Sequence, residues 1–394
     1  MDLSDNSSVL VRLFDEDRDF EAVGRLEKSC ELGEKRRFSI FSNITDDPLC
    51  RIRFHKIRVM LVAELVRSRE LVGVVRGCIK CVGTGSETSF ASLGWILGLR
   101  VSPKHRRKGI GLKLVKSVEC WAIKNGAEYI CLATEESNIA SRNLFVLKCG
   151  YVKLNPLIII VQPTQARVLR WSRGVKIEKL TVDHAISLYK DRLNGKELFP
   201  LDIDVILKQE LSLGTWVSYF KDEEWCGLGC KEKDDTFTHK APSSWAILSM
   251  WNTSKVYSLQ VRGAVLWRIF NGIVRSIGAS PCLGIPQEGC GVPSKAFGFT
   301  FLYGLYGEGE KTGELMRSLW RFACNLARNV KGCEAVVTEL GVYDPLREHF
   351  PAATSTSCIA DLWFFKKLND TNGEEDRWSS QQPLPHLFVD PRDF

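Results

Sequence analysis

Apolar and polar residues along the first half of the chain alternate in a way that predicts strands and helices in turn. Short runs rich in Val, Ile and Leu indicate strands, whereas apolar residues three or four positions apart indicate helices. One predicted helix starts after Asp15 or Asp17, either of which can cap it, and a second spans 112–124. Residues 31–48 are polar and turn-rich, so we predict an irregular segment on the substrate side. The predicted strands are 9–13, 59–65, 71–81, 95–101, 129–133 and a last one near 156–162.

The second half repeats this order in a weaker form. A strand at 299–306, a glycine-containing loop, a helix at 314–330 and a strand at 331–339 repeat the order found around the helix at 112–124. The segment Asn125–Glu128 also aligns with Lys331–Glu334. We therefore predict two units, residues 1–165 and residues 175–394, of which the second is a degenerate copy of the first. Further elements predicted in it are a helix at 182–194 behind Thr181 and strands at 213–220, 243–252 and 257–261.

The stretch between the strand at 95–101 and the helix at 112–124 has the composition of a phosphate-binding loop. After the Ser102–Pro103 break come the basic residues Arg106, Arg107 and Lys108, and then Gly109-Ile110-Gly111. Glycines let backbone N–H groups approach a bulky anion, and a helix amino terminus adds unpaired N–H groups and a positive dipole end. The spacing fits neither a P-loop nor a dinucleotide fingerprint. The sequence therefore predicts a polyphosphate ligand of another kind.

Two motifs in this region resemble those of the GNAT acetyltransferase superfamily. Arg106-x-x-Gly109-x-Gly111 after a strand resembles motif A, and Asn138, Ser141, Leu144-Phe145 and Gly150-Tyr151 resemble motif B. The resemblance implies an α/β (α+β) fold with a mixed, mostly antiparallel sheet flanked by helices, followed here by a second, degenerate GNAT-like domain. It also implies acetyl-CoA as co-substrate. The cofactor-binding residues that it implies are Leu99, Arg100, Val101, Arg106, Arg107, Lys108, Gly109, Ile110, Gly111, Leu112, Asn138 and Ser141.

The residues that would handle protons are less clear from the sequence. Many family members have a Tyr acid where this chain has Phe145, and a Glu base where it has Trp95. A phenyl ring cannot protonate a thiolate, so the candidates are Glu135, Glu136, Tyr129 and Tyr151. The two glutamates can also be solvated turn carboxylates, and the two tyrosines can be packed aromatics. The acceptor is a protein or a small amine. A non-catalytic acyl-CoA-binding scaffold remains the alternative.

Charge and cysteine usage limit the other function classes. Residues 1–175 hold 29 Lys and Arg against 19 Asp and Glu, compared with 54 and 47 in the whole chain, which agrees with an anionic ligand in the first half. Among the 14 cysteines, Cys78-x-x-Cys81 and Cys226-x-x-x-Cys230 could suggest a metal, but the first pair lies in a predicted strand and no matching pair of ligands follows at finger-like spacing, so no metal site is predicted. No nucleic-acid motif, signal region or membrane-spanning run occurs, which predicts an intracellular chain with no membrane partner.

The chain as a whole resembles the plant Hookless-type N-acetyltransferases. The segments that carry this resemblance are 47–53, 97–103, 211–215 and the ending Leu387–Phe394. It implies a nuclear or cytoplasmic protein, with the nucleus favoured, that acts in growth controlled by ethylene and auxin signalling. In the second half, the loop Gly307–Gly313 carries two glutamates that would repel a pyrophosphate, so only the first half is expected to bind acetyl-CoA.

Overall fold

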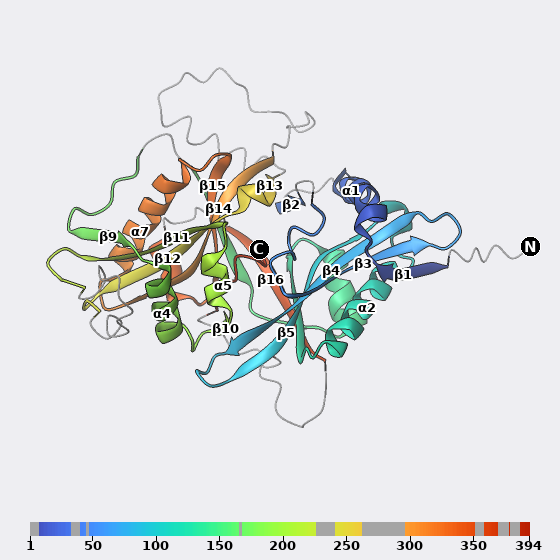
Figure 1. Cartoon of the computed structure of the whole chain (residues 1–394), viewed down its shortest axis with the longest axis horizontal. Coiled ribbons are helices and arrows are strands. Elements are labelled where there is room, and N and C mark those ends of the chain that lie inside the picture. The colour runs from blue at the N-terminus through green and yellow to red at the C-terminus, as the bar shows by residue number, and fades with distance from the viewer. Residues whose placement is uncertain are drawn as a thin grey trace, which may run out of the picture.

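The computed structural model describes residues 8–32, 40–44, 47–164, 168–225, 241–261, 296–350, 358–368, 378 and 387–394. Within these residues, 16 strands form one continuous sheet, and helices cover it in two groups (Figure 1). The main path through the sheet is β1-β3-β4-β5-β6-β16-β8-β15-β14-β12-β11-β9. The GNAT-type mixed sheet predicted from the sequence is confirmed, and both halves of the chain contribute to it.

The first half supplies one end of this sheet. Its strands are antiparallel except β5 and β6, which run parallel and are joined through α2. This helix packs so closely that a Cβ atom on Gly73 would lie 2.9 Å from Leu114, and one on Gly77 would lie 3.0 Å from Val118. The elements are β1 (Val9–Leu13), α1 (Glu16–Leu32), β3 (Ile57–Leu65), β4 (Leu71–Thr84), β5 (Phe90–Val101), α2 (Ile110–Lys124) and β6 (Tyr129–Glu135).

The second half repeats the arrangement at the other end. Strands β14 and β15 are parallel and joined through α7, as β5 and β6 are joined through α2. Gly98 in β5 and Gly304 in β14 both have left-handed backbones, with φ of 59° and 61°, and each lies next to a shift in strand register. The elements are β9 (Val175–Lys179), α4 (Val182–Arg192), β11 (Ser212–Phe220), β12 (Trp245–Asn252), β14 (Ala296–Glu308), α7 (Thr312–Ala327) and β15 (Cys333–Gly341).

The two halves exchange strands at the centre of the sheet. β8 (Leu157–Pro163) leaves the first half and pairs with β15 of the second, whereas β16 (Cys358–Lys367) returns from the second half and pairs with β6 of the first. The two exchanged strands also pair with each other. β8 confirms the strand predicted near 156–162, and in the sheet it lies between β16 and β15 because β16 occupies the edge of β6. The domain boundary at residues 165–175 stays a prediction. Each half contributes one strand that pairs with a strand of the other half.

Shorter elements complete the described chain. Residues 31–48 were predicted to be irregular, but Ile40–Ile44 forms β2, which pairs with β13 (Tyr257–Val261) of the other half. No helix among the described residues is long and apolar enough to cross a membrane. The remaining elements are α3 (Ile139–Arg142), a π-helical segment (Asn143–Lys148), β7 (Val152–Lys153), β10 (Glu197–Pro200), α5 (Ile203–Lys208) and short 3₁₀ turns at Pro103–His105, Thr253–Lys255 and Pro345–His349.

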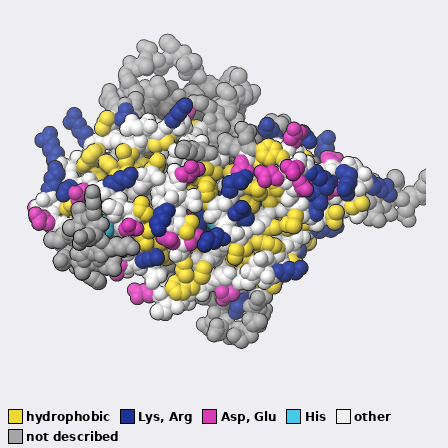
Figure 2. Space-filling view, in the orientation of Figure 1, with side chains coloured by type: hydrophobic (Ala, Val, Ile, Leu, Met, Phe, Trp, Pro, Cys, Tyr) yellow, Lys and Arg dark blue, Asp and Glu magenta, His cyan; other side chains and the backbone are white. Residues whose placement is uncertain are grey.

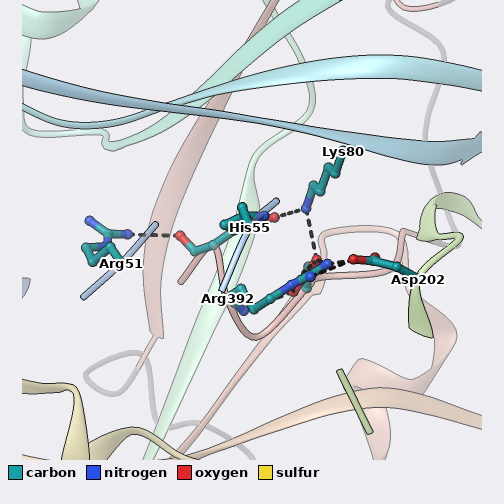
Figure 3. Close-up of polar contacts among 7 residues, drawn as sticks. Arg51, His55, Lys80, Asp202 and Arg392 are labelled. Atoms are coloured by element: carbon teal, nitrogen blue, oxygen red, sulfur yellow. Dashed lines mark hydrogen bonds and ion pairs between the residues drawn. The ribbon is translucent and has the colours of Figure 1, made fainter. Parts of the chain in front are cut away.

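The segment 387–394 joins the halves through buried ion pairs. Arg392 binds Asp202 at 2.8 Å and Asp390 at 2.7 Å, and Lys80 of β4 binds Asp390 at 3.2 Å and also Asp393. Figure 3 shows Lys80, Arg392 and Asp202 converging on this segment. All of these side chains except that of Asp202 are buried. The segment is therefore fixed to β4 of the first half and to the loop before α5 of the second.

Candidate active site

Strand β5 separates from β6 at a defined point. The parallel pairing runs from Leu93 to Trp95 and then stops, while β5 continues along β4 past a register shift opposite Val74–Arg76. Among the described strands, none pairs with the edge of β5 that faces β6 beyond Trp95. The half-buried residues Leu99, Arg100 and Val101 therefore lie in the diverging part of β5. The Leu99 carbonyl accepts a hydrogen bond from the Arg100 side chain at 3.2 Å and the Val101 carbonyl accepts one from Arg106 at 3.3 Å, so the binding role of this backbone stays a prediction.

The glycine loop lies at the end of β5 and leads directly into α2. Gly109 caps α2 with a left-handed backbone, φ 77°, and a Cβ atom there would meet nothing within 4 Å. Arg106, Arg107 and Lys108 are exposed, and the first turn of α2 holds no acidic residue. Ile110 is buried in the core under α2, so only its backbone can serve a ligand. The loop is thus an open, basic cradle at a helix amino terminus, which fits a pyrophosphate.

The residues of the second motif lie against this cradle. Leu144 approaches the start of α2, where a Cβ atom on Gly111 would lie 3.4 Å from its side chain. Asn138 caps α3 by accepting a hydrogen bond from the Ser141 backbone N–H at 3.1 Å, and it donates to the Thr134 hydroxyl at 3.2 Å. Asn138 is exposed and Thr134 is half-buried. The structure therefore brings the two motifs together, while the binding role of Asn138 and Ser141 stays a prediction.

Many other basic residues of the first half are already paired. Arg12 binds Asp19 and Glu64 at 2.6 Å each, and Arg18 also binds Glu64, at 2.5 Å. Burial alone would raise the pKa of Glu64, but the hydrogen bond and charge of Arg12 hold it below its usual value. Figure 2 shows Lys and Arg side chains beside Asp and Glu side chains at the end of the molecule where α1 and β1 lie. The charges of Arg12 and Arg18 are therefore compensated within the fold, whereas no ion pair is found for the basic residues of the glycine loop in the described chain.

Three of the candidate catalytic residues lie in different surroundings. Glu135 ends β6 on the side of the glycine loop and accepts a hydrogen bond from the Ser137 hydroxyl at 3.3 Å. Tyr129 begins β6, so it lies at the opposite end of that strand, where it packs on Trp378. Tyr151 is buried beside Phe145, and burial followed by the charge of Glu119 raises its pKa well above the usual range. Their catalytic roles remain predictions. Of the three residues, Glu135 lies on the side of the glycine loop, and this position favours a catalytic role.

Comparison with known proteins decides the family. A family model described as "Acetyltransferase (GNAT) family" matches residues 37–151. The Arabidopsis thaliana protein "Probable N-acetyltransferase HLS1" is 40% identical over 98% of this chain and 100% of its own length. The chain belongs to the GNAT acetyltransferase family. The rice protein (Oryza sativa subsp. japonica) "Acetyl transferase GW6a" is 33% identical over 98% of this chain and 97% of its own length.

A solved structure shows the same two-part fold. Saccharomyces cerevisiae N-myristoyltransferase with bound myristoyl-CoA aligns with 97% of this chain and 90% of its own, with a TM-score of 0.55 and 12% identity. At this identity the likeness concerns the fold alone. The acyl donor of the GNAT family is acetyl-CoA, and the open loop at Gly109 together with the divergence of β5 from β6 fits it. Arg106, Arg107, Lys108 and the amino terminus of α2 would hold its phosphates, and it would supply the acetyl thioester.

The corresponding loop of the second half is filled by its own chain. A Cβ atom on Gly309 would lie 2.1 Å from the Ser243 carbonyl, and one on Gly313 would lie 2.5 Å from the His349 ring. The Glu308 carboxylate accepts hydrogen bonds from Tyr306 at 2.9 Å and Arg192 at 3.2 Å. This loop therefore presents packed side chains and an acidic group where the first loop presents open backbone.

The bulge of the second half holds a tyrosine where the first half holds the Arg76 guanidinium, 2.7 Å from the Cβ position of Gly98. The hydroxyl of Tyr189 lies 2.5 Å from where a Cβ atom of Gly304 would be, and it is hydrogen bonded to Ser249 at 2.8 Å. We therefore expect one acetyl-CoA to bind per chain, as measured by isothermal titration calorimetry on the purified protein. A stoichiometry of two would contradict a closed second site.

Sequence reasoning missed a buried arginine at the bulge of β5. Arg76 is fully buried, and its Nη1 atom would lie 2.7 Å from a Cβ atom on Gly98. The guanidinium donates to the Pro48 carbonyl at 2.6 Å and to Glu27 at 2.8 Å, but Nη1 has no partner among the described residues. The sequence could not identify Arg76 as a residue of the site. It lies in a strand of mixed composition, and the sequence does not show which side chain faces the bulge.

One group of potential metal ligands occurs in the described part of the chain. His55, Cys78 and Asp393 are buried, and one ligand atom of each lies within 4.8 Å of the others. Burial, followed by the charge of Arg392, lowers the pKa of His55 to about 3, so the imidazole is neutral. Asp393 is bound by Lys80 and belongs to the ion-pair network of the segment 387–394. The sequence predicts no metal site, and that expectation stays a prediction.

Proposed function

We propose that this GNAT acetyltransferase transfers the acetyl group of acetyl-CoA to an amine on a protein. The observation that carries the proposal is the open glycine loop beside the divergence of β5 and β6. The corresponding loop of the second half is filled by its own chain. The face of the sheet opposite α2 at this divergence is built by both halves, because β16 of the second half lies next to β6. This shared face supports a large acceptor such as a polypeptide over a small amine.

The biological setting is part of the proposal. Resemblance to the plant Hookless-type proteins, together with the plant relatives of similar length, supports a role in hormone-regulated growth and a place in the nucleus. A fluorescent fusion expressed in plant cells tests the location, and exclusion from the nucleus would contradict it.

The experiment that tests the reaction is acetylation of a peptide library by the purified protein. We expect acetyl groups on lysine side chains or peptide amino termini, detected by mass spectrometry, with small polyamines as competing acceptors. The protein with Gly111→Glu serves as the matched inactive control. Acetylation of the small amines alone would contradict a protein acceptor. Acetyl-CoA binding without turnover on any amine would instead favour the non-catalytic scaffold.

A further inference from the structure

The exchanged strand β16 brings an acidic residue of the second half to the active site of the first. In the antiparallel pairing of β16 with β6, Asp361 is opposite Glu135 and Trp363 is opposite Ala133. Because β6 runs parallel to β5, its Glu135 end lies on the side of the glycine loop. Asp361 is therefore placed next to the part of β6 from which β5 has diverged.

Asp361 is part of a buried polar group that reaches β5. The Trp363 indole N–H donates to Glu339 of β15 at 3.1 Å, and its ring packs edge-on against Trp95, with ring centres 4.8 Å apart. Trp95 is the last residue of β5 that pairs with β6. Glu339 and Asp361 are 5% and 9% exposed, and their carboxyl groups are hydrogen bonded to each other. The acid pair is thus connected through two tryptophans to the point where the strands separate.

Two buried donors at the same divergence have no partner in the described chain. They are Trp95 Nε1 and Arg76 Nη1, on side chains that are 1% and 0% exposed. Arg76 lies against the bulge at Gly98, and Trp95 contacts Trp363. A buried N–H without an acceptor destabilises the fold, so such groups are normally satisfied by a ligand or by water. A polar ligand group or a water at the divergence would satisfy these two donors.

We propose that Asp361, hydrogen bonded to Glu339, carries the proton of the acceptor amine during acetyl transfer. This assignment rests on the proposed function. The Asp361 carboxylate takes one N–H proton as the amine nitrogen forms its bond to the acetyl carbon and the carbon–sulfur bond breaks. The sulfur leaves with the electron pair of that bond, and Asp361 returns the proton to it. The products are an amide and a free thiol, and the carboxylate is regenerated.

The surroundings of Asp361 suit a proton carrier. Burial is the largest cause that raises its pKa to about 7, so near neutral pH it can both accept and release a proton. The charged groups that face the pair are Glu135 of β6, Arg51 of the segment before β3 and Asp393 of the carboxyl-terminal segment. Glu339 has a pKa well above its usual value, first because of burial and then because of Asp361. The raised pKa favours the protonated form of Glu339, which can donate a hydrogen bond to the Asp361 carboxylate. This pair would return the proton to the thiolate, a role that Phe145 cannot fill because it has no hydroxyl.

The test compares Asp361→Asn with wild type in acetylation of the best peptide found for the wild type. We expect kcat to fall by about 10²–10⁴, the usual contribution of a general acid–base group, with little change in the Kd of acetyl-CoA. In wild type, kcat/KM should rise with pH to a plateau above about pH 7, because the carboxylate is the active form. The variant should lose this dependence. Circular dichroism and the Kd of acetyl-CoA report whether it is folded.

A second variant separates proton transfer from a structural role. Glu339→Met removes the donor to Asp361, so the acid limb of the kcat/KM profile should move to higher pH while the plateau is largely kept. Glu334→Gln, at the other end of β15, is the matched control and should leave the profile unchanged.

A folded Asp361→Asn variant that binds acetyl-CoA and keeps wild-type turnover and pH profile would overturn the assignment of Asp361 alone. If the acid limb of the kcat/KM profile does not move in Glu339→Met, the proposed role of Glu339 as hydrogen-bond donor to Asp361 is also overturned. A wild type that acetylates no amine would overturn the proposed function and this inference together.

Discussion

Gly111→Glu abolishes acetyl-CoA binding and leaves the fold intact. The substitution places a carboxylate at the second residue of α2, beside the loop that holds the phosphates. Two like charges about 4 Å apart near a protein surface repel by about 4 kcal/mol, which corresponds to on the order of 10³-fold in Kd. The fold is spared because an acidic residue in the first turn favours a helix, and because a Cβ atom there meets Leu144 at an ordinary 3.4 Å. Calorimetry measures the loss, and thermal denaturation checks the fold.

Gly24→Glu provides the matched control for this experiment. Gly24 lies within α1, where an added Cβ atom meets nothing within 4 Å, so the same glycine-to-glutamate change is made on a helix away from the loop. We expect the Kd of acetyl-CoA to stay within about twofold of wild type, because surface substitutions seldom have larger effects. Retained binding in Gly111→Glu, or equal loss in both variants, would mean that the cofactor site lies elsewhere.

Lys80→Met destabilises the protein by about 3–5 kcal/mol. Lys80 is buried between Asp390 and Asp393 and lies over the Trp95 ring, so its removal leaves two buried carboxylates with less compensation. Burial alone would raise the pKa of Asp390, but Arg392 and Lys80 hold it far below the usual value. A carboxylate with a lowered pKa stabilises the fold above its unfolded pKa of about 4 and loses this effect as the pH falls. The variant should therefore show a smaller loss of stability on acidification, measured by urea denaturation at several pH values.

Lys116→Met serves as the control for the loss of a charge. Lys116 forms a partly exposed ion pair with Glu119 on α2, so its replacement should cost less than about 1 kcal/mol. A similarly small cost for Lys80→Met would show that the buried network contributes little to stability.

The sequence predicted those parts of the molecule that depend on local chemistry. The glycine loop, α2 and β6 follow from residues that are neighbours in the chain, because helix periodicity, capping and turn glycines act over a few positions. The internal repeat also predicted the parallel pair β14–β15, and the equivalence extends to the left-handed glycines Gly98 and Gly304. From its two glutamates, the sequence predicted that the second loop would repel a pyrophosphate, and the absence of binding there stays a prediction. The structure adds packing of Gly309 and Gly313 that the sequence does not show.

Strand pairing between distant segments could not be predicted in the same way. β8 and β16 are both apolar strands, and nothing in their own residues states which edge they join. A strand edge can pair with any strand whose apolar and polar residues alternate in the same way. Which strand pairs with it therefore depends on the fold of the whole chain. The same exchange explains why Asp361 and Glu339 were missed. They belong to the second half, where the sequence predicted no cofactor binding. Only the order of the strands in the sheet places them beside β6.

The strand exchange also constrains how the chain can fold during synthesis on the ribosome. When the acetyl-CoA loop and β6 have emerged, the edge of β6 that will receive β16 is still open, since β16 is made after β15 and α7. An open strand edge favours association with other chains, and contacts between distant segments slow folding. We therefore expect the sheet of the first half to be completed only after β16 has been synthesised, because β16 covers the edge of β6.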